Sequence, residues 1–600
     1  MTDDLLKIKN VAVSFRSAVG TTIAVKDVSY SVARGETLAV VGESGSGKSV
    51  TARAIMGMLA PNATVSKDTH VWFDGEDLST WSELELQKIR GKRISMIFQE
   101  PLTSLNPIYR IGDQVGEIIR FHRDISKKDL RAEVLRLLAE VQLPDPESRI
   151  DQYPHEMSGG QRQRVMIAMA LANKPDLLIA DEPTTALDVT VQAEILSLLK
   201  DLQARHGMAV VLITHDLTVV SKVSDKVVVM RQGEVVERGQ TREVFANPQH
   251  PYTKHLIESE PKGLPDPLDE NAPVVMEGRN MGVTFSLNAG GFFNPVTKEL
   301  KAVDNISAMI RRGETLGIVG ESGSGKTTLA MAMIRLGVFH KGEISFKGTR
   351  IDQLDRKALR PFRTKMQVVF QDPFSSLNPR MIIRQILEEG LVVNGIGKSA
   401  KDRDQIVRKA LDDVQMPHTA LDRFPHEFSG GQRQRISIAR ALALRPEIVL
   451  CDEAVSSLDV SIQAQILNLL LELQQQQGLS YLFISHDLAV IQHLADRVAV
   501  MYLGRIVEIA NRKELFQTPA HPYTQALLRA IPSGDPKTRR PLADRVLAGD
   551  VPSPTKQHTG CVFAERCPQV TSECLQHRPE FRQIRTGQLV ACHHAQIDSA

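Results

Sequence analysis

Short apolar runs that end abruptly in polar residues recur along the chain. TLAVVG (37–42) and TLGIVG (315–320) each run into a glycine-rich loop, whereas DLLIADEP (176–183) and EIVLCDEA (447–454) each end in Asp-Glu. Continuous apolar runs of this length are typical of strands buried on both faces, as in a parallel sheet. Patterns with helical spacing follow both glycine-rich loops. The pattern therefore predicts an α/β protein with buried parallel strands.

The whole pattern occurs twice, which predicts a duplicated domain. The repeated segments keep the same order and nearly constant spacing: VGESGSGK (41–48, 319–326), FQEP or FQDP (98–101, 370–373), SGGQRQR (158–164, 429–435), THDL or SHDL (214–217, 485–488) and HPYT (250–253, 521–524). A chain of 600 residues is long enough for two domains that each bury a core. We expect a first domain over 1–263, a linker over 264–273, a second domain over 274–532 and a C-terminal extension over 533–600.

Composition and charge narrow the class of protein. Charged residues make up 24% and apolar residues 42% of the chain, as in ordinary globular proteins, and the net charge is +2. This balance gives no general footprint for a polyanion, so we expect no nucleic-acid partner. No apolar run approaches the ~20 residues that span a bilayer. The N-terminus MTDDLLKIKN also lacks the layout of a secretory signal, so we predict a soluble, cytosolic chain.

The repeated loop has the form G-x-x-x-x-G-K-[ST] and lies between a predicted strand and a predicted helix. Its glycines let backbone N–H groups close around phosphate oxygens, and the helix N-terminus adds partial positive charge. Lys48 and Lys326 are predicted to reach the β- and γ-phosphates, and the hydroxyls of Ser49 and Thr327 to bind Mg²⁺. The predicted nucleotide-binding residues of the two loops are Gly42, Ser44, Gly45, Gly47, Lys48, Ser49, Gly320, Ser322, Gly323, Gly325, Lys326, Thr327 and Thr328.

Acidic pairs end two of the predicted buried strands. Ligands of open parallel sheets bind at the carboxyl ends of the strands, so these acids are expected beside the phosphates. Asp181 and Asp452 are predicted to hold Mg²⁺, a hard cation that prefers oxygen and water. Glu182 and Glu453 are predicted to orient and polarise the attacking water.

Two further polar residues follow predicted strands in each half. His215 and His486 come after the third such strand, from which a side chain can reach the γ-phosphate. Gln99 and Gln371 end the strands ISMIFQ and MQVVFQ, where an amide can bind Mg²⁺ or the attacking water. Taken singly, a histidine after a strand is usually a structural hydrogen-bonder, so the inference depends on its place after the loop and the acids.

The segment SGGQRQR predicts a second anion-binding element in each half. Ser158 and Ser429 fit a helix N-cap, and two glycines and a helical run follow each of them. A capped helix start with free N–H groups binds anions, and Gly160 and Gly431 lie in this start. Each half thus has two phosphate-binding ends, although one nucleotide would need only one.

With these motifs in this order, each half resembles an ATP-binding-cassette nucleotide-binding domain, and the resemblance covers nearly the whole chain. The order is phosphate loop, glutamine loop, SGGQ signature, Asp-Glu strand, an ALD or SLD turn (Ala186–Asp188, Ser457–Asp459) and a switch histidine. Met157 and Phe428 depart from the family pattern, which usually has Leu there. The resemblance implies two tandem domains, each with a mostly parallel core sheet, an antiparallel β subdomain and a helical subdomain.

The resemblance also implies a head-to-tail sandwich in which each ATP lies between the loop of one half and the signature of the other. One site would combine Lys48, Asp181, Glu182 and His215 with Ser429 and Gly431. The other would combine Lys326, Asp452, Glu453 and His486 with Ser158 and Gly160. Both glutamates are present, so two competent ATPase sites are expected.

The resemblance further implies an aromatic side chain that stacks on adenine. Phe15 is the candidate in the first half. In the second half Phe285 competes with Phe292 and Phe293, and the sequence does not choose among them.

The segments EPLTSLNPI (100–108) and DPFSSLNPR (372–380), together with the HPYT segments, resemble the ATPases of bacterial dipeptide, oligopeptide, nickel and glutathione importers. This implies a peptide-importer ATPase that docks on two transmembrane permease subunits through the segments after Gln99 and Gln371. It implies a peptide-binding protein in the same system and a peripheral location on the cytoplasmic side of the bacterial inner membrane. The cargo itself is not encoded in this chain.

The alternative is a twin-cassette ATPase that acts on ribosomes. That class is expected to have a long charged helical linker between its cassettes. The linker here is the short, Pro- and Asp-rich KGLPDPLDENAP (262–273), which favours the importer.

Four of the five cysteines lie after residue 560: Cys561, Cys567, Cys574 and Cys592. The fifth, Cys451, lies near the end of an apolar run and is predicted to be a small buried side chain. Disulfides are disfavoured in the cytosol, so the cluster predicts a metal site. The gaps exceed the two to four residues of zinc knuckles, and four thiolates also hold iron–sulfur clusters. The GC-x-F-x-x-RCP wording (560–568) resembles the extension of peptide-importer ATPases, some of which carry a [4Fe–4S] cluster. We predict that cluster first and zinc second, with His577, His593 and His594 as alternative ligands.

Overall fold

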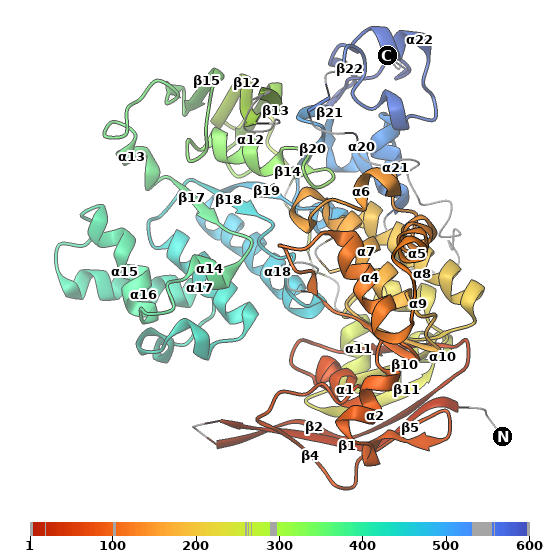
Figure 1. The fold of residues 1–600 in the computed structure, drawn as a ribbon. Coiled ribbons are helices and arrows are strands. Elements are labelled where there is room, and N and C mark those ends of the chain that lie inside the picture. Colours follow the sequence, from red (N-terminus) through yellow and green to blue (C-terminus); the bar gives the residue numbers. More distant parts are fainter. Residues whose placement is uncertain are drawn as a thin grey trace.

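The computed structural model describes residues 4–17, 20–99, 104–185, 187–258, 261, 263–265, 267–288, 297–530, 552, 555–556 and 558–596. Two halves with the same element order lie side by side in Figure 1. The first half runs from red to yellow and the second from green to blue. The C-terminal extension lies against the second half, beside β21.

Each half contains a core sheet and a separate antiparallel sheet. In the first half the core order is β11-β10-β3-β9-β8-β7, parallel except for β11, and the antiparallel order is β2-β1-β5-β6 with β4 beside β1. The core strands are β3 (Thr37–Val41), β7 (Ile94–Ile97), β8 (Leu177–Asp181), β9 (Ala209–Ile213), β10 (Lys226–Arg231) and β11 (Glu234–Gln240). The others are β1 (Asp4–Ser17), β2 (Gly20–Ala33), β4 (Ala63–Val65), β5 (His70–Phe73) and β6 (Glu76–Asp77).

The second half repeats this plan and enlarges its core sheet. The core order is β17-β18-β19-β14-β20-β21-β23-β22, and the antiparallel order is β13-β12-β15-β16. The core strands are β14 (Thr315–Val319), β17 (Met366–Val369), β18 (Ile448–Asp452), β19 (Ser480–Ile484), β20 (Arg497–Tyr502), β21 (Arg505–Asn511), β22 (Arg582–Arg585) and β23 (Gln588–Val590). The others are β12 (Val274–Asn288), β13 (Thr297–Arg311), β15 (Lys341–Phe346) and β16 (Thr349–Arg350).

Helices cover the core sheets and build a helical region before each signature. Those of the first half are α1 (Lys48–Ile55), α2 (Glu83–Ile89), α4 (Ile111–His122), α5 (Lys127–Glu140), α6 (Pro146–Arg149), α7 (Gly159–Leu171), α8 (Val189–His206), α9 (Leu217–Val223), α10 (Thr241–Ala246) and α11 (Pro251–Ile257). Those of the second half are α12 (Lys326–Met333), α13 (Arg360–Arg363), α14 (Pro373–Ser376), α15 (Ile383–Val393), α16 (Ala400–Asp413), α17 (Gly430–Leu442), α18 (Val460–Gln477), α19 (Leu488–Leu494), α20 (Arg512–Gln517), α21 (Pro522–Ala530) and α22 (Ser572–Gln576).

The predicted buried strands are confirmed. Every residue of β3, β8, β14 and β18 is buried, because helices and the antiparallel sheet cover both faces of the core sheet. The first glycine-rich loop connects β3 to α1, and the second connects β14 to α12, as the sequence predicted. Cys451 lies in β18 with no exposed surface, as expected for a small apolar side chain. The α/β fold with two repeated units follows from the sequence pattern alone.

The C-terminal extension contains two short strands, β22 and β23. Strand β23 pairs antiparallel with β21, and β22 pairs with β23, so the extension continues the core sheet of the second half. The buried amide of Gln588 donates to the Glu508 carboxylate at 2.8 Å, which gives this buried charge a hydrogen-bond partner where the extension meets the core sheet. The sequence analysis missed these strands because each has only three or four residues.

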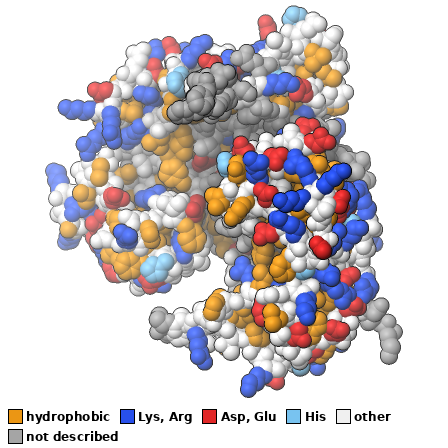
Figure 2. Space-filling view, in the orientation of Figure 1, with side chains coloured by type: hydrophobic (Ala, Val, Ile, Leu, Met, Phe, Trp, Pro, Cys, Tyr) orange, Lys and Arg blue, Asp and Glu red, His pale blue; other side chains and the backbone are white. Residues whose placement is uncertain are grey.

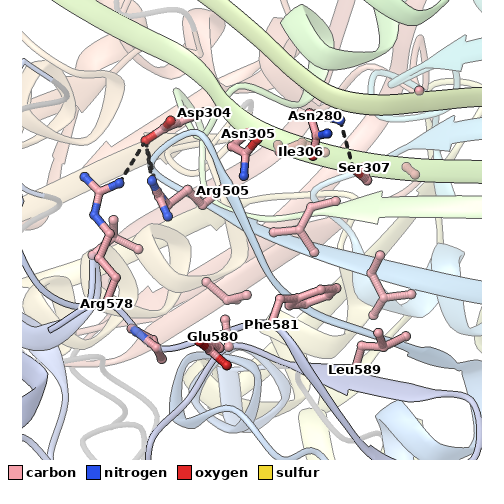
Figure 3. A pocket seen from close by; sticks show the side chains of 18 of the residues that line it. Asn280, Asp304, Asn305, Ile306, Ser307, Arg505, Arg578, Glu580, Phe581 and Leu589 are labelled. Atoms are coloured by element: carbon pink, nitrogen blue, oxygen red, sulfur yellow. Dashed lines mark hydrogen bonds and ion pairs between the residues drawn. The ribbon is translucent and has the colours of Figure 1, made fainter. Parts of the chain in front are cut away.

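A cavity of about 590 Å³ lies where the extension meets β12, β13 and β21. In Figure 3 Arg505 and Arg578 point at Asp304, while Phe581 and Leu589 line another wall. An Asp304 oxygen lies 2.5 Å from Arg505 and 3.6 Å from Arg578. This ion-pair network ties the extension to the antiparallel sheet.

Among the described residues, no helix has the length and apolar character needed to cross a bilayer. The described residues of the linker, 264–265 and 267–273, form neither helix nor strand. The long helix that the translation ATPase would require is therefore absent from this part of the chain.

Candidate functional site

The two glycine-rich loops have the same geometry. Lys48 Nζ donates to the carbonyls of Gly42 and Glu43 at 2.7 and 2.9 Å, and Lys326 Nζ donates to Gly320 and Glu321 at 2.7 and 3.0 Å. Burial lowers the pKa of both ammonium groups. Each lysine therefore lies folded along its own loop, close to where the phosphates of a nucleotide would bind.

The loop backbone at Gly42 leaves no room for a side chain, so only glycine fits there. Gly42 has φ of +149°, and a Cβ there would lie 2.2 Å from the carbonyl oxygen of Met230. The hydroxyls of Ser46 and Ser324 inside the loops are buried without a hydrogen-bond partner. An unsatisfied buried donor beside a row of backbone N–H groups fits an anion, so the loops suit a phosphate chain.

A hydroxyl and a carboxylate meet beside each loop. Ser49 Oγ donates to Asp181 at 2.8 Å, and Thr327 Oγ1 donates to Asp452 at 2.9 Å. Burial raises the pKa of both carboxyl groups, against the opposing hydrogen bond from each hydroxyl. Both sets offer the oxygen ligands that Mg²⁺ prefers.

The glutamate after each Asp binds the glutamine and the histidine that the sequence singled out. Gln99 Nε2 donates to Glu182 at 2.8 Å, and the His215 ring nitrogen lies 3.2 Å from the same carboxylate. Burial alone would raise the pKa of Glu182, but the hydrogen bond and charge of His215 outweigh it and lower that pKa to about 2. Burial alone would lower the pKa of His215, but the hydrogen bond and charge of Glu182 outweigh burial and raise that pKa. The two groups form an ion pair.

The second half has the same arrangement. Gln371 Nε2 donates to Glu453 at 2.8 Å, and the His486 ring lies 3.3 Å from that carboxylate. Both glutamines therefore contact the glutamate, rather than the aspartate or hydroxyl predicted to bind Mg²⁺. Glu182 and Glu453 also have φ of +49° and +48°, a left-handed conformation that costs free energy for a residue with a Cβ. This strain was not visible in the sequence.

The signature segments start helices as predicted. Ser158 is the N-cap of α7, and its hydroxyl accepts from the Gln161 N–H at 3.3 Å. Ser429 caps α17 in the same way. A Cβ on Gly160 or Gly431 would lie 2.6 or 2.4 Å from a side chain of the following long helix, so glycine lets the signature pack closely.

Contacts between the halves join each loop to the other half. The Ser44 N–H donates to Asp459 at 2.9 Å, and the Ser322 N–H donates to Asp188 at 2.7 Å. Asp188 and Asp459 are the N-caps of α8 and α18, in the turns that follow the Asp-Glu strands. The loops therefore face each other's halves head to tail. Of the first turn, Ala186 lies outside the described residues.

Four residues at this junction were missed by the sequence analysis. Ser461 Oγ donates to Glu43 at 2.7 Å, and Thr190 Oγ1 donates to Glu321 at 3.1 Å. Each pair occupies the same position in the two repeats, within GESGSGK and after the ALD or SLD turn. This repetition in both halves was the sequence signal that could have identified the four residues.

Residues 25–185 and 303–456 match the ABC transporter family. The chain belongs to the ABC transporter family. It is an ATPase of that family with two tandem cassettes. Residues 236–275 and 507–574 match the oligopeptide/dipeptide transporter C-terminal region, which includes both HPYT segments.

Similar proteins cover nearly the whole chain. The peptidoglycan transport ATP-binding protein YejF of Agrobacterium fabrum is 51% identical over 529 residues, which are 88% of this chain and 96% of that protein. The glutathione import ATP-binding protein GsiA of Pectobacterium atrosepticum is 45% identical over 583 residues, 92% and 93% of the two chains. GsiA of Escherichia coli is 46% identical over 580 residues, 91% and 92%. These relatives support the importer interpretation over the translation ATPase.

Two of the candidate aromatic residues for stacking on adenine, Phe15 and Phe285, lie in described strands. Phe15 is half-buried in β1, and Phe285 in β12 is 37% exposed, so both can present a ring edge or face at the antiparallel sheet. Phe292 and Phe293 lie outside the described residues, and the choice in the second half stays open.

The four C-terminal cysteines are neighbours. The Cys561 N–H donates to the Cys574 carbonyl at 2.7 Å, and the Cys574 sulfur lies 3.4 Å from the His594 ring. Burial, with the nearby charges of Cys592, Cys574 and Cys567, raises the pKa of Cys561 to about 11. Across the described residues, no group of three or more His, Cys, Asp or Glu side chains is arranged to hold a metal ion. The predicted cluster gains no support from this arrangement.

Proposed function

We propose that the chain is the ATP-hydrolysing subunit of a bacterial importer for peptides or glutathione-like cargo, with residues 1–263 and 274–532 as its two cassettes. The observation that carries the two-site mechanism is the pair of hydrogen bonds between halves, Ser44 to Asp459 and Ser322 to Asp188. The cargo class rests on the relatives' names and on the oligopeptide/dipeptide transporter region in both halves.

In the proposed first site, the loop from Gly42 to Ser49 binds the phosphates through its N–H groups and Lys48. Ser49 and Asp181 would hold Mg²⁺, which would supply positive charge to offset the negative charge of the phosphates. Ser429 and Gly431 of the other half present the N-terminus of α17 to the γ-phosphate. The second site uses the matching residues: Gly320–Thr328, Asp452, Ser158 and Gly160.

Glu182 and Glu453 are proposed to orient the attacking water. A carboxylate with a pKa near 2 holds a proton poorly, so Glu182 polarises the water rather than storing its proton. Against the effect of burial, the neighbouring glutamates raise the pKa of His215 and His486, which favours the protonated ring, and both rings are proposed to lie beside the γ-phosphate. Gln99 and Gln371 bridge from the catalytic glutamates to the segments that follow them.

Two permease subunits are proposed to dock beside these glutamine segments. Exposed apolar side chains occur at matching positions of the repeats: Phe121 at the end of α4 is 68% exposed and Val393 at the end of α15 is 57% exposed. In the first half, Phe98 and Phe121 line a cavity of about 320 Å³. Figure 2 shows apolar side chains gathered on the second half, between its antiparallel sheet and its helical region. Paired apolar patches fit a partner with two similar subunits. We propose a peripheral location on the cytoplasmic face of the inner membrane, with a peptide-binding protein in the same system.

Uptake of labelled glutathione and tripeptides by host cells lacking the gene tests this function. Wild type should restore uptake. Phe121→Glu with Val393→Glu should lower uptake at least about tenfold while the purified chain keeps its ATPase rate, because a charge in an apolar contact opposes docking. Leu84→Glu on the exposed surface of α2 is the matched control and should have no effect. Uptake that is normal without the gene contradicts the proposed cargo.

We also propose that the C-terminal thiols bind a metal, a [4Fe–4S] cluster first and zinc second. This proposal rests on the sequence pattern of Cys561, Cys567, Cys574 and Cys592, because no group of three or more side chains in the described residues is placed to bind a metal. Protein purified without oxygen should contain about four iron and four sulfide per chain, and Cys567→Ser should lose them. One zinc per chain favours the second choice, and metal-free wild type ends the proposal.

A further inference from the structure

Glu321, in the second phosphate loop, is a buried carboxylate with an unusual partner. Arg566 of the C-terminal extension binds it with both terminal nitrogens, at 2.7 Å to Oε2 and 3.2 Å to Oε1. The side chains of Arg566 and Glu321 are only 4% and 3% exposed. The same carboxylate accepts from Thr190 of the first half. One loop residue thus joins the extension, the second cassette and the first cassette.

The segment that carries Arg566 is fixed against the second half. Phe563 is buried between Tyr502 and Tyr523, with ring centroids 5.3 Å from each. The Tyr523 hydroxyl in turn accepts from the Glu321 N–H at 3.0 Å. Both the backbone and the side chain of Glu321 are therefore held by the neighbourhood of this segment, so Arg566 approaches the loop in a defined position.

Among the described residues, no side chain of the extension forms a hydrogen bond or ion pair with Glu43 of the first loop. Its Glu43 accepts from Ser461 and is only partly buried. Arg231, which ends β10, lies 4.8 Å from the ring of Tyr252, whose hydroxyl accepts from the Glu43 N–H. In the second half the repeat places Tyr502 at the position of Arg231.

In the second half the arginine next to the loop is Arg566, which binds Glu321 itself. It lies 6.0 Å from the Tyr502 ring and comes from a different part of the chain. In the first cassette an arginine of β10 packs on the tyrosine that binds the loop backbone, whereas in the second an arginine of the extension binds the loop glutamate itself.

We propose that Arg566 is a positioning residue of the second ATP site, which makes nucleotide binding there, and not at the first loop, dependent on the C-terminal extension. A buried carboxylate without its cation would repel the phosphates and strain the loop, because a lone charge in the interior is poorly solvated. With Arg566 present, the charge of Glu321 is offset by a buried ion pair. This inference rests on the proposed role of the two loops as nucleotide sites.

The test uses full-length chains in which only one loop can bind. Lys48→Ala leaves the second loop and Lys326→Ala leaves the first. With Lys48→Ala, adding Arg566→Met should raise the ATP Kd about ten- to a hundredfold in equilibrium dialysis. With Lys326→Ala, the same change should alter the Kd less than about twofold.

Two further variants separate positioning from general damage. Glu321→Gln with Arg566→Met removes both charges and should return the second-loop Kd to within about threefold of the parent chain, because replacing both partners leaves no unpaired charge. Arg578→Met breaks a different ion pair between the extension and the second half, with Asp304, and should leave both Kd values unchanged.

The outcomes are distinct. If neither single-loop chain binds ATP, the assignment of the loops fails. If both bind but Arg566→Met weakens both loops equally, weakens neither, or is not rescued by the double change, the positioning role is wrong. If Arg566→Met does not fold, the rescued double variant decides: a second-loop Kd more than about threefold weaker than that of the parent chain overturns the proposal.

Discussion

A chain with Glu182→Gln and Glu453→Gln should bind ATP as wild type does and hydrolyse it about 10²–10⁴-fold more slowly. Glutamine keeps the shape of the side chain and a hydrogen-bond acceptor for Gln99 and Gln371, but it removes the charge that polarises the attacking water. The left-handed backbone at both positions stays the same, so the ATP-binding loops should be unaffected. Phosphate release and ATP retention on the same sample measure the two effects.

The matched control for this experiment is Glu76→Gln, an exposed residue in β6 of the antiparallel sheet. It should leave the rate unchanged. The loss of the Glu182–His215 ion pair should also lower the pKa of His215 toward its ordinary value, visible in a histidine titration. Near-normal hydrolysis by the double variant would show that these glutamates do not act on the water.

The second large effect concerns which signature serves which loop. Lys48→Ala with Ser429→Arg damages one composite site twice and should leave one tightly bound ATP per chain. Lys48→Ala with Ser158→Arg damages both sites and should leave none, with each lost set of charge-assisted contacts costing about ten- to a hundredfold in affinity. Equilibrium dialysis with Mg-ATP counts the bound nucleotides.

If each cassette closed its own site, the two double variants would give the opposite result. Arginine at Ser429 or Ser158 also removes a helix cap, which costs about 1 kcal/mol. Lys48→Ala with Ser399→Arg controls for this, because Ser399 caps α16 away from the loops. This control should bind one ATP.

The sequence by itself determined the local parts of this protein. The buried strands, the loop between β3 and α1, and the serine caps of α7 and α17 all form as predicted. These features depend on residues close together in the chain: apolar runs bury both faces, glycine permits the loop backbone, and a serine side chain satisfies the first N–H groups of its own helix. Their duplication predicted two units.

The tertiary structure decided every feature that depends on residues far apart in the chain. The partner of Glu321 is one example, because nothing in the spacing of Arg566 relates it to the second loop. The pairing of β21 with β23 is another, since a three-residue strand gains its hydrogen bonds only from a distant edge. The contacts of Ser44 with Asp459 and of Ser322 with Asp188 arise only when two folded halves pack together. Local spacing constrains a helix, strand or loop, whereas packing of the whole chain selects which buried charges meet.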